Sequence, residues 1–247
     1  MHNGKSSTHN KKGTERILDA ENVPSYALSM PRTARASVGG VVYHALNRGN
    51  RQEAVFHKPA DYDAFVDAIV DAKRHIPLDI LSYCLMPNHF HLVVRPQADG
   101  DLGRWMRRLL TAHAQRYHRQ CHTSGHVWQG RYKAFPIQVD SHLATVLRYV
   151  ESNPLRAELV ARAEHWKWSS LPGWLGTDSL LWRRKPPIRT PYWVDRVNEP
   201  LAVGDLHRVR ESVNRERPFG GEEWTRQTAE ALGLESTLRT RGRPRKV

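Results

Sequence analysis

Four stretches of the chain carry apolar residues in patterns typical of β-strands. The first, residues 41–49 (VVYHALNRG), runs into a turn at Asn47-Arg48-Gly49. Residues 78–86 (LDILSYCLM) and 89–96 (HFHLVVRP) are separated by so short a connection that they predict a β-hairpin. A fourth, shorter strand is expected in YKAFPIQVD, where Pro136 interrupts it.

Three other stretches have the apolar spacing of amphipathic helices. Residues 59–76 begin with Pro59 and repeat Phe65, Ile69 and Ala72 on one face. Residues 103–120 form a long predicted helix with a strongly basic face. The third helix, residues 141–153, has Ser141 as its expected N-cap and ends before Pro154.

The order strand, helix, strand, strand, helix, strand, helix predicts an α+β fold. It is the ferredoxin-like split βαβ plan, an antiparallel sheet flanked by helices, with a further helix added at its end. We expect a disordered polar segment over residues 1–36, a folded domain over 37–165, and a basic extension over 166–247 that is rich in Trp and Pro. This extension is expected to hold one helical patch, residues 221–234, and to end in a basic tail.

The net charge narrows the classes of partner. The 247 residues include 38 Lys and Arg against 25 Asp and Glu, a formal charge of +13. A field of this sign attracts polyanions, nucleic acid first. No apolar run is long enough for a membrane span, no signal core is present, and the two cysteines predict no disulfide framework. We therefore expect a cytoplasmic, nucleoid-associated protein without a membrane partner.

Candidate metal-binding and catalytic residues occur in two blocks of the sequence, MPNHFHLVV and RYVESNPLRAELV. Residues two apart on a strand share a face, so His89 and His91 would project together and could form part of a metal site. Alone, such a pair is more often two ordinary histidines. Tyr149 and Asn153 are four residues apart on a predicted helix and would share a face as well, although a tyrosine there is commonly a core residue.

Together with GHVWQGRYKAFPIQ, these two blocks resemble the single-tyrosine transposases of the insertion-sequence type, most closely the REP-associated tyrosine transposases within the HUH endonucleases. The resemblance implies that His89, His91 and Asn153 bind Mg²⁺ or Mn²⁺. It implies that Tyr149 is the nucleophile, which leaves a 5′-phosphotyrosine and a free 3′-OH. The implied activity is nicking and strand transfer on single-stranded DNA that carries hairpins or palindromes, with repetitive extragenic palindromes as targets. A monomer and a homodimer are both compatible with it.

Basic residues other than the residues with an implied catalytic or metal-binding role predict contacts with DNA. Arginines are dense on the helix over 103–120, and the third block and the C-terminal RGRPRK add further cations; the set is Arg104, Arg107, Arg108, Arg131, Lys133, Arg241, Arg243, Arg245 and Lys246. The last four resemble an AT-hook, which fits the minor groove of A·T-rich duplex. A solvated helix face and a bare basic tail are the simpler interpretations.

Three alternatives remain open from the sequence. The chain could bind DNA or RNA hairpins without cleaving them, or it could cleave with a metal-bound water while Tyr149 is only structural. His118, Cys121, His122 and His126 lie close together in sequence, but without a paired CxxC a zinc site is the weaker interpretation.

Overall fold

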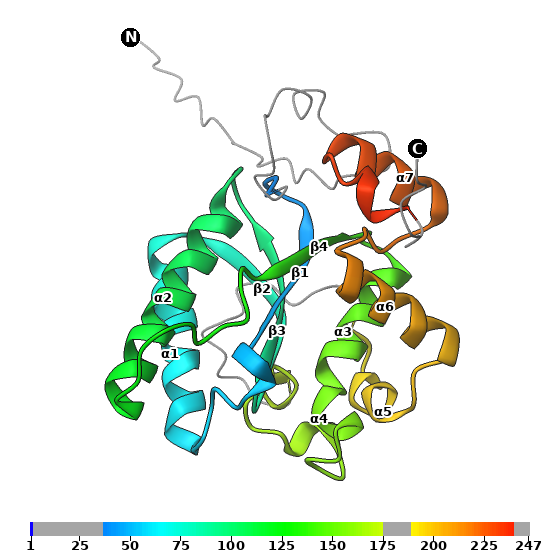
Figure 1. Ribbon diagram of the computed structural model, residues 1–247. Helices are drawn as coiled ribbons and strands as arrows, with labels where there is room; N and C mark the ends of the chain where they lie inside the picture. Colours follow the sequence, from blue (N-terminus) through cyan, green and yellow to red (C-terminus); the bar gives the residue numbers. More distant parts are fainter. Residues whose placement is uncertain (2–36, 175–188, 240–247) are drawn as a thin grey trace, which may run out of the picture.

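The structure is a computed structural model that describes residue 1 and residues 37–174 and 189–239 (Figure 1). Two predictions lie outside the described residues. The first is the disordered segment over residues 1–36, of which only residue 1 is described. The second is the AT-hook-like tail with Arg241, Arg243, Arg245 and Lys246.

A four-stranded antiparallel sheet forms the centre of the molecule (Figure 1). Its strands, in the spatial order β2-β3-β1-β4, are β1 (Val42–Arg48), β2 (Leu78–Met86), β3 (His89–Pro96) and β4 (Lys133–Ile137). Strands β2 and β3 form the predicted hairpin, with Met86 opposite His89. The two central strands, β3 and β1, are buried on both faces, which explains the nearly continuous apolar run after His91.

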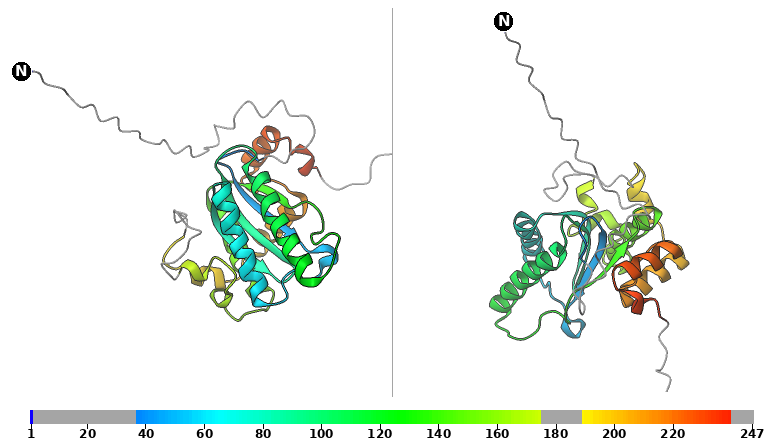
Figure 2. Two further views of the ribbon diagram at one scale, coloured as in Figure 1. Left: turned by 90° about the vertical axis from the view of Figure 1, so that its left-hand side faces the viewer. Right: turned by 90° about the horizontal axis from the view of Figure 1, so that it is seen from above.

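Two long helices, α1 (Pro59–His75) and α2 (Asp101–Cys121), cover one face of the sheet (Figure 2). Phe65 of α1, Trp105 of α2 and Phe90 of β3 are fully buried between these layers. Trp128, which follows α2, joins the same core at 7% exposure, so its main role is packing. The connection between β1 and α1 contains the short helix η2 (Asn50–Gln52).

The opposite face is covered by helices from both the middle and the end of the chain. These are α3 (Ser141–Glu151), α4 (Asn153–Arg156), α5 (Trp193–Asn198) and α6 (Val203–Arg215). Val146, Trp193 and Val209 belong to one buried cluster with Val93 of β3. Residues far beyond 165 therefore complete the core on which α3 rests, while the boundary at residue 165 stays a prediction.

The remaining elements are short or peripheral. The predicted C-terminal helix is α7 (Glu222–Ala231), and single turns occur at η3 (Ala163–His165), η4 (Pro172–Trp174) and η5 (Glu235–Thr237). The α+β, ferredoxin-like fold predicted from the element order is confirmed. Along the described residues, no helix is both long and apolar enough to cross a membrane.

The third predicted helix differs from the expectation at both ends. Asp140 is its N-cap, with the carboxylate accepting from the backbone N–H of His142, so the assignment of Ser141 as N-cap was wrong. The helix also does not run through residue 153. It ends at Glu151, Ser152 lies between α3 and α4, and Asn153 begins α4. Pro154 contributes to this break because it has no N–H to donate to a carbonyl in the last turn of α3, whereas a proline is tolerated in the first turn of a new helix such as α4.

Candidate active site

Strand β3 directs His89 and His91 toward the α3 side of the sheet. Their ring centroids are 5.0 Å apart, as expected for residues two apart on one strand face. His91 is buried, with 3% exposure, and His89 is half-buried at the start of the strand. The pair therefore begins at the surface and extends inward.

Each of the two rings is oriented by a hydrogen bond at Nδ1. Nδ1 of His91 lies 2.8 Å from Nε2 of His44, a fully buried residue of β1. Nδ1 of His89 lies 2.6 Å from the side-chain oxygen of Asn88. These contacts leave Nε2 of both histidines for another partner, which is the arrangement that metal-binding histidines commonly have.

Burial keeps the imidazoles of this cluster neutral. It lowers the pKa of His44 to about 3 and that of His89 to about 4. The pKa of His91 is held well below its usual range by burial first, and then by the neighbouring His44 and His89. A neutral imidazole has a lone pair to offer a metal ion, whereas a protonated one has none.

The last turn of α3 brings Tyr149 against these histidines. Its ring centroid is 5.8 Å from that of His91 and 6.2 Å from that of His44, both in edge-on geometry. The guanidinium carbon of Arg156 lies 4.2 Å from the Tyr149 ring centroid, on the opposite side of the break at Ser152. A phenol, two imidazoles and one cation thus converge from four elements, α3, β3, β1 and α4.

Asn153 is buried, with 9% exposure, at the first position of α4. Because the helix is broken before it, the position of Asn153 relative to Tyr149 is set by the turn at Ser152 and not by regular i, i+4 spacing. Arg156 donates to the Ser152 hydroxyl over 3.1 Å, and this bond braces the turn.

The family comparison covers this region. Residues 37–153 match the family model described as "Transposase IS200 like". The matched segment starts just before β1 and ends at Asn153, so it includes both histidines and Tyr149. This part of the chain is therefore similar to the IS200-like transposases.

One curated protein and two solved structures are similar to parts of this chain. A Haemophilus influenzae protein, named as a REP-associated tyrosine transposase, is 24% identical over 143 residues, which cover 53% of this chain and 80% of that protein. A solved structure described as a REP-associated tyrosine transposase bound to a REP hairpin has a TM-score of 0.49 and 19% identity, over 65% of this chain and 99% of that one. A Deinococcus radiodurans structure described as a transposase has a TM-score of 0.35 and 20% identity, over 49% of this chain and 96% of that one.

The predicted helix arginines, Arg104, Arg107 and Arg108, are exposed residues of α2. Helix α2 covers the face of the sheet opposite α3, the helix that carries Tyr149 (Figure 2). Arg104, Arg107 and Arg108 line a groove together with Thr111 and Gln115. Two of these arginines already have acidic partners within the chain. Arg104 pairs with Asp101, and Arg108 pairs with Asp71 over 2.9 Å.

The two basic residues near β4 are placed differently. Arg131 is exposed just before the strand. Lys133 is half-buried, and its ammonium group donates to the backbone carbonyls of Val213 and Asn214 at the end of α6, over 3.4 and 3.3 Å. Of the five predicted DNA-binding residues that the structure describes, Lys133 is therefore the one most clearly engaged in holding the fold together.

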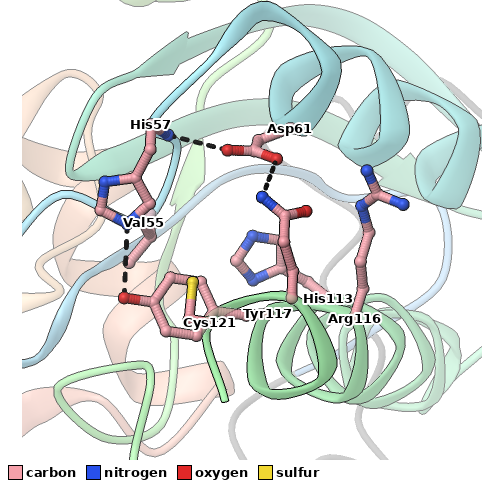
Figure 3. A pocket seen from close by; sticks show the side chains of 8 residues that line it. Val55, His57, Asp61, His113, Arg116, Tyr117 and Cys121 are labelled. Atoms are coloured by element: carbon pink, nitrogen blue, oxygen red, sulfur yellow. Dashed lines mark hydrogen bonds between the residues drawn. The ribbon is translucent and has the colours of Figure 1, made fainter. Parts of the chain in front are cut away.

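A small recess between the 55–61 segment and the end of α2 contains several polar groups (Figure 3). The Asp61 carboxylate accepts from the backbone N–H groups of His57 and Lys58 and from the Gln120 amide, so it acts as a cap for α1. Nearby, both ring nitrogens of His118 are bonded, to Thr123 and to the carbonyl of Gly125. Within the described ranges, no group of three His, Cys, Asp or Glu side chains could hold a metal, and the zinc interpretation has no support.

Three residues of the site were not assigned from the sequence. His44 gave a usable signal, because it lies on β1 with its side chain on the sheet face that carries His91. Arg156 was close in sequence to Tyr149, but only the turn at Ser152 brings it onto the ring. Glu151 gave no signal, since a carboxylate in an amphipathic helix is normally exposed; here it has no exposed surface.

Proposed function

We propose that this protein is a metal-dependent single-stranded DNA endonuclease and strand transferase. It would cleave DNA that carries hairpins or palindromes and form a 5′-phosphotyrosine intermediate at Tyr149. The observation that carries the proposal is the packing of Tyr149 against two neutral imidazoles, with the Arg156 guanidinium over the phenol ring. The IS200-like family match supports the same chemistry.

His89, His91 and Asn153 are the residues that would hold Mg²⁺ or Mn²⁺. The two free Nε2 atoms on one strand face fit such an ion, and the amide oxygen of Asn153 would be the third protein ligand. When bound, the ion would supply Lewis-acid polarisation of the scissile phosphate. Mg²⁺ prefers oxygen ligands, so phosphate and water oxygens would complete the shell and binding without DNA would be weak.

The covalent step conserves the phosphodiester bond energy. The Tyr149 oxygen bonds to phosphorus, the bond from phosphorus to the 3′-oxygen breaks, and that oxygen leaves as a 3′-OH after taking up a proton. The phenolic proton is lost to solvent before or during attack. The Arg156 guanidinium lies over the ring and would stabilise the negative charge that develops on Tyr149 as its proton leaves during attack. Reversal of the step by a 3′-OH rejoins or transfers the strand without ATP.

The charge of the chain and its relatives suggest the substrate. A net charge of +13 favours a polyanion, and the Haemophilus relative is named for association with REP elements. We infer that a hairpin stem would lie along basic surface of the domain while an unpaired phosphate enters between His91 and Tyr149. Either a monomer or a homodimer could present such a site.

A labelled single strand with a hairpin, incubated with Mn²⁺ and run on a denaturing gel, tests the proposal. We expect a protein–DNA adduct that is lost in Tyr149→Phe and in His89→Ala, while both variants still bind the hairpin. Cleavage without an adduct that persists in Tyr149→Phe would favour a water nucleophile. Hairpin binding without cleavage over a range of metals and strands would favour a binding protein.

A further inference from the structure

Glu151 is a carboxylate without any exposed surface, two residues beyond Tyr149 in the last turn of α3. Successive helical residues are rotated by about 100°, so the two side chains leave the helix on different sides. Tyr149 meets the histidines, while Glu151 points toward β2 and the C-terminal part of the chain. The transposase chemistry proposed above does not use Glu151.

Four side chains donate hydrogen bonds to this one carboxylate. Oε1 accepts from Ser82 over 2.9 Å, from Ser170 over 2.8 Å, and from Arg189. Oε2 accepts from the Trp193 indole N–H over 2.7 Å. A buried carboxylate is costly unless it is paired and hydrogen-bonded, and Glu151 has both kinds of partner.

Three of these donors come from residues beyond 165. Residues 168–170 run along the outer edge of β2, where the Ser170 N–H donates to the Tyr83 carbonyl and the Leu85 N–H donates to the Trp168 carbonyl. Trp193 begins α5. Glu151 is thus the point at which the sheet edge, the segment beside it and α5 all join the end of α3.

Arg189 supplies the charge that balances Glu151. Its side chain is 2% exposed, and it also donates to the Leu81 carbonyl over 3.1 Å, at the register shift of β2. Burial lowers the pKa of Arg189 to about 10, so its guanidinium is still charged at neutral pH. A buried ion pair adds little net stability compared with apolar residues of the same volume; what it can add is selection of one arrangement over others.

The end of α3 needs a contact that selects one arrangement of the chain. The helix stops at Glu151, and the chain turns at Ser152 before Asn153 and Arg156, so no continuous helix fixes the residues that flank Tyr149. We propose that Glu151 is a positioning residue, through which the C-terminal segment that carries Ser170, Arg189 and Trp193 holds Tyr149 in register with the histidines. The catalytic part of this proposal, that Tyr149 is held for attack, rests on the function proposed above. The structural part, that Glu151 holds the end of α3, does not.

The test compares Glu151→Gln with the matched variant Glu223→Gln, which changes an exposed carboxylate of α7. Hydrogen–deuterium exchange of residues 149–156 reports whether the helix end is held. Single-turnover adduct formation at saturating hairpin DNA and Mn²⁺ reports whether Tyr149 is in place. We expect faster exchange and an adduct rate lower by about a hundredfold in Glu151→Gln, since small misplacement of a reacting group costs that much. Hairpin affinity stays within about twofold, because Glu151 is buried away from solvent.

The other possible outcomes also test the proposed role of Glu151. Unchanged exchange in residues 149–156 would overturn the proposal, and so would faster exchange with a wild-type adduct rate. If the wild type forms no adduct, the proposed function fails, and exchange alone decides whether Glu151 holds the helix end. If Glu151→Gln does not fold, Trp193→Phe removes one donor and leaves the ion pair; the same two measurements then apply, with a smaller loss of rate.

Discussion

The guanidinium of Arg156 lies over the ring of Tyr149, 4.2 Å from its centroid, although the two residues belong to different helices. Burial lowers the pKa of Arg156, and a Tyr149 phenolate acts in the opposite direction. The contact places a largely desolvated cation over the ring of the residue that would attack the phosphate. The bend at Ser152 is therefore part of the site and not only a helix end.

Arg156→Gln is expected to slow adduct formation more than it weakens DNA binding. Only the part of the contact that strengthens as charge develops on Tyr149 affects the rate, and a gain of about 2 kcal/mol there corresponds to a rate lower by roughly 30-fold in the variant. Arg156→Lys keeps the charge and should recover part of the rate. Single-turnover kinetics at saturating DNA measure this, with the exposed Arg162→Gln as control. A loss confined to DNA affinity would assign Arg156 to phosphate binding instead.

His44→Phe is expected to weaken Mn²⁺ binding by about tenfold, although His44 is not proposed as a ligand. It bonds Nδ1 of His91 over 2.8 Å, and the loss of a residue that orients a metal-binding histidine commonly costs about this much. His44→Asn offers His91 a polar partner again and should bind better than His44→Phe. Mn²⁺ binding followed by electron paramagnetic resonance needs no DNA. Equal Mn²⁺ affinity in the wild type, His44→Phe and His44→Asn would contradict the role of His44 in orienting His91.

Acid is expected to destabilise the protein between pH 6.5 and pH 4, partly through His113. Burial lowers its pKa to about 4 in the folded state, below the usual 6.5. As the pH falls, the unfolded chain therefore binds the proton first. The stability from a neutral His113, about 3 kcal/mol, is fully present above pH 6.5 and lost toward pH 4.

His113→Leu should flatten this pH dependence. Nδ1 of His113 is buried without a hydrogen bond among the described residues, so an apolar replacement removes no such contact at that atom. Urea unfolding at several pH values measures the change, and the exposed His165→Leu is the matched control. An unchanged slope in His113→Leu would assign the acid sensitivity to the other histidines whose pKa values burial lowers, which are His44, His89 and His91.

Replacing Arg104, Arg107 and Arg108 by Gln should weaken hairpin binding and reduce its salt dependence. Loss of three phosphate contacts lowers the slope of log affinity against log salt by about 2 to 3. The adduct rate at saturating DNA should not change, since the arginines lie across the sheet from Tyr149. Arg208, Arg217 and Arg226, changed together to Gln, give a control with the same net charge. An equal effect in both triple variants would mean that only overall charge matters.

The order of strands and helices could be predicted from the sequence because it depends on local patterns. Apolar residues at strand and helix spacing in residues 59–76, 78–86 and 89–96 fixed the element types, and the short connection between the last two fixed the hairpin. His89 and His91 share a face for the same local reason, the twofold repeat of a strand. Where local signals competed, as between Asp140 and Ser141 for the N-cap, the prediction failed.

The sequence by itself thus determined the fold class, the basic character and the paired histidines, all of which depend on neighbours along the chain or on composition. Only the tertiary structure decided that His44 orients His91, that Arg156 covers Tyr149, and that Glu151 is buried against Arg189. These contacts join residues on separate elements, and Glu151 and Arg189 are 38 positions apart. No local pattern encodes such pairs, because what brings them together is the packing of whole helices on the sheet.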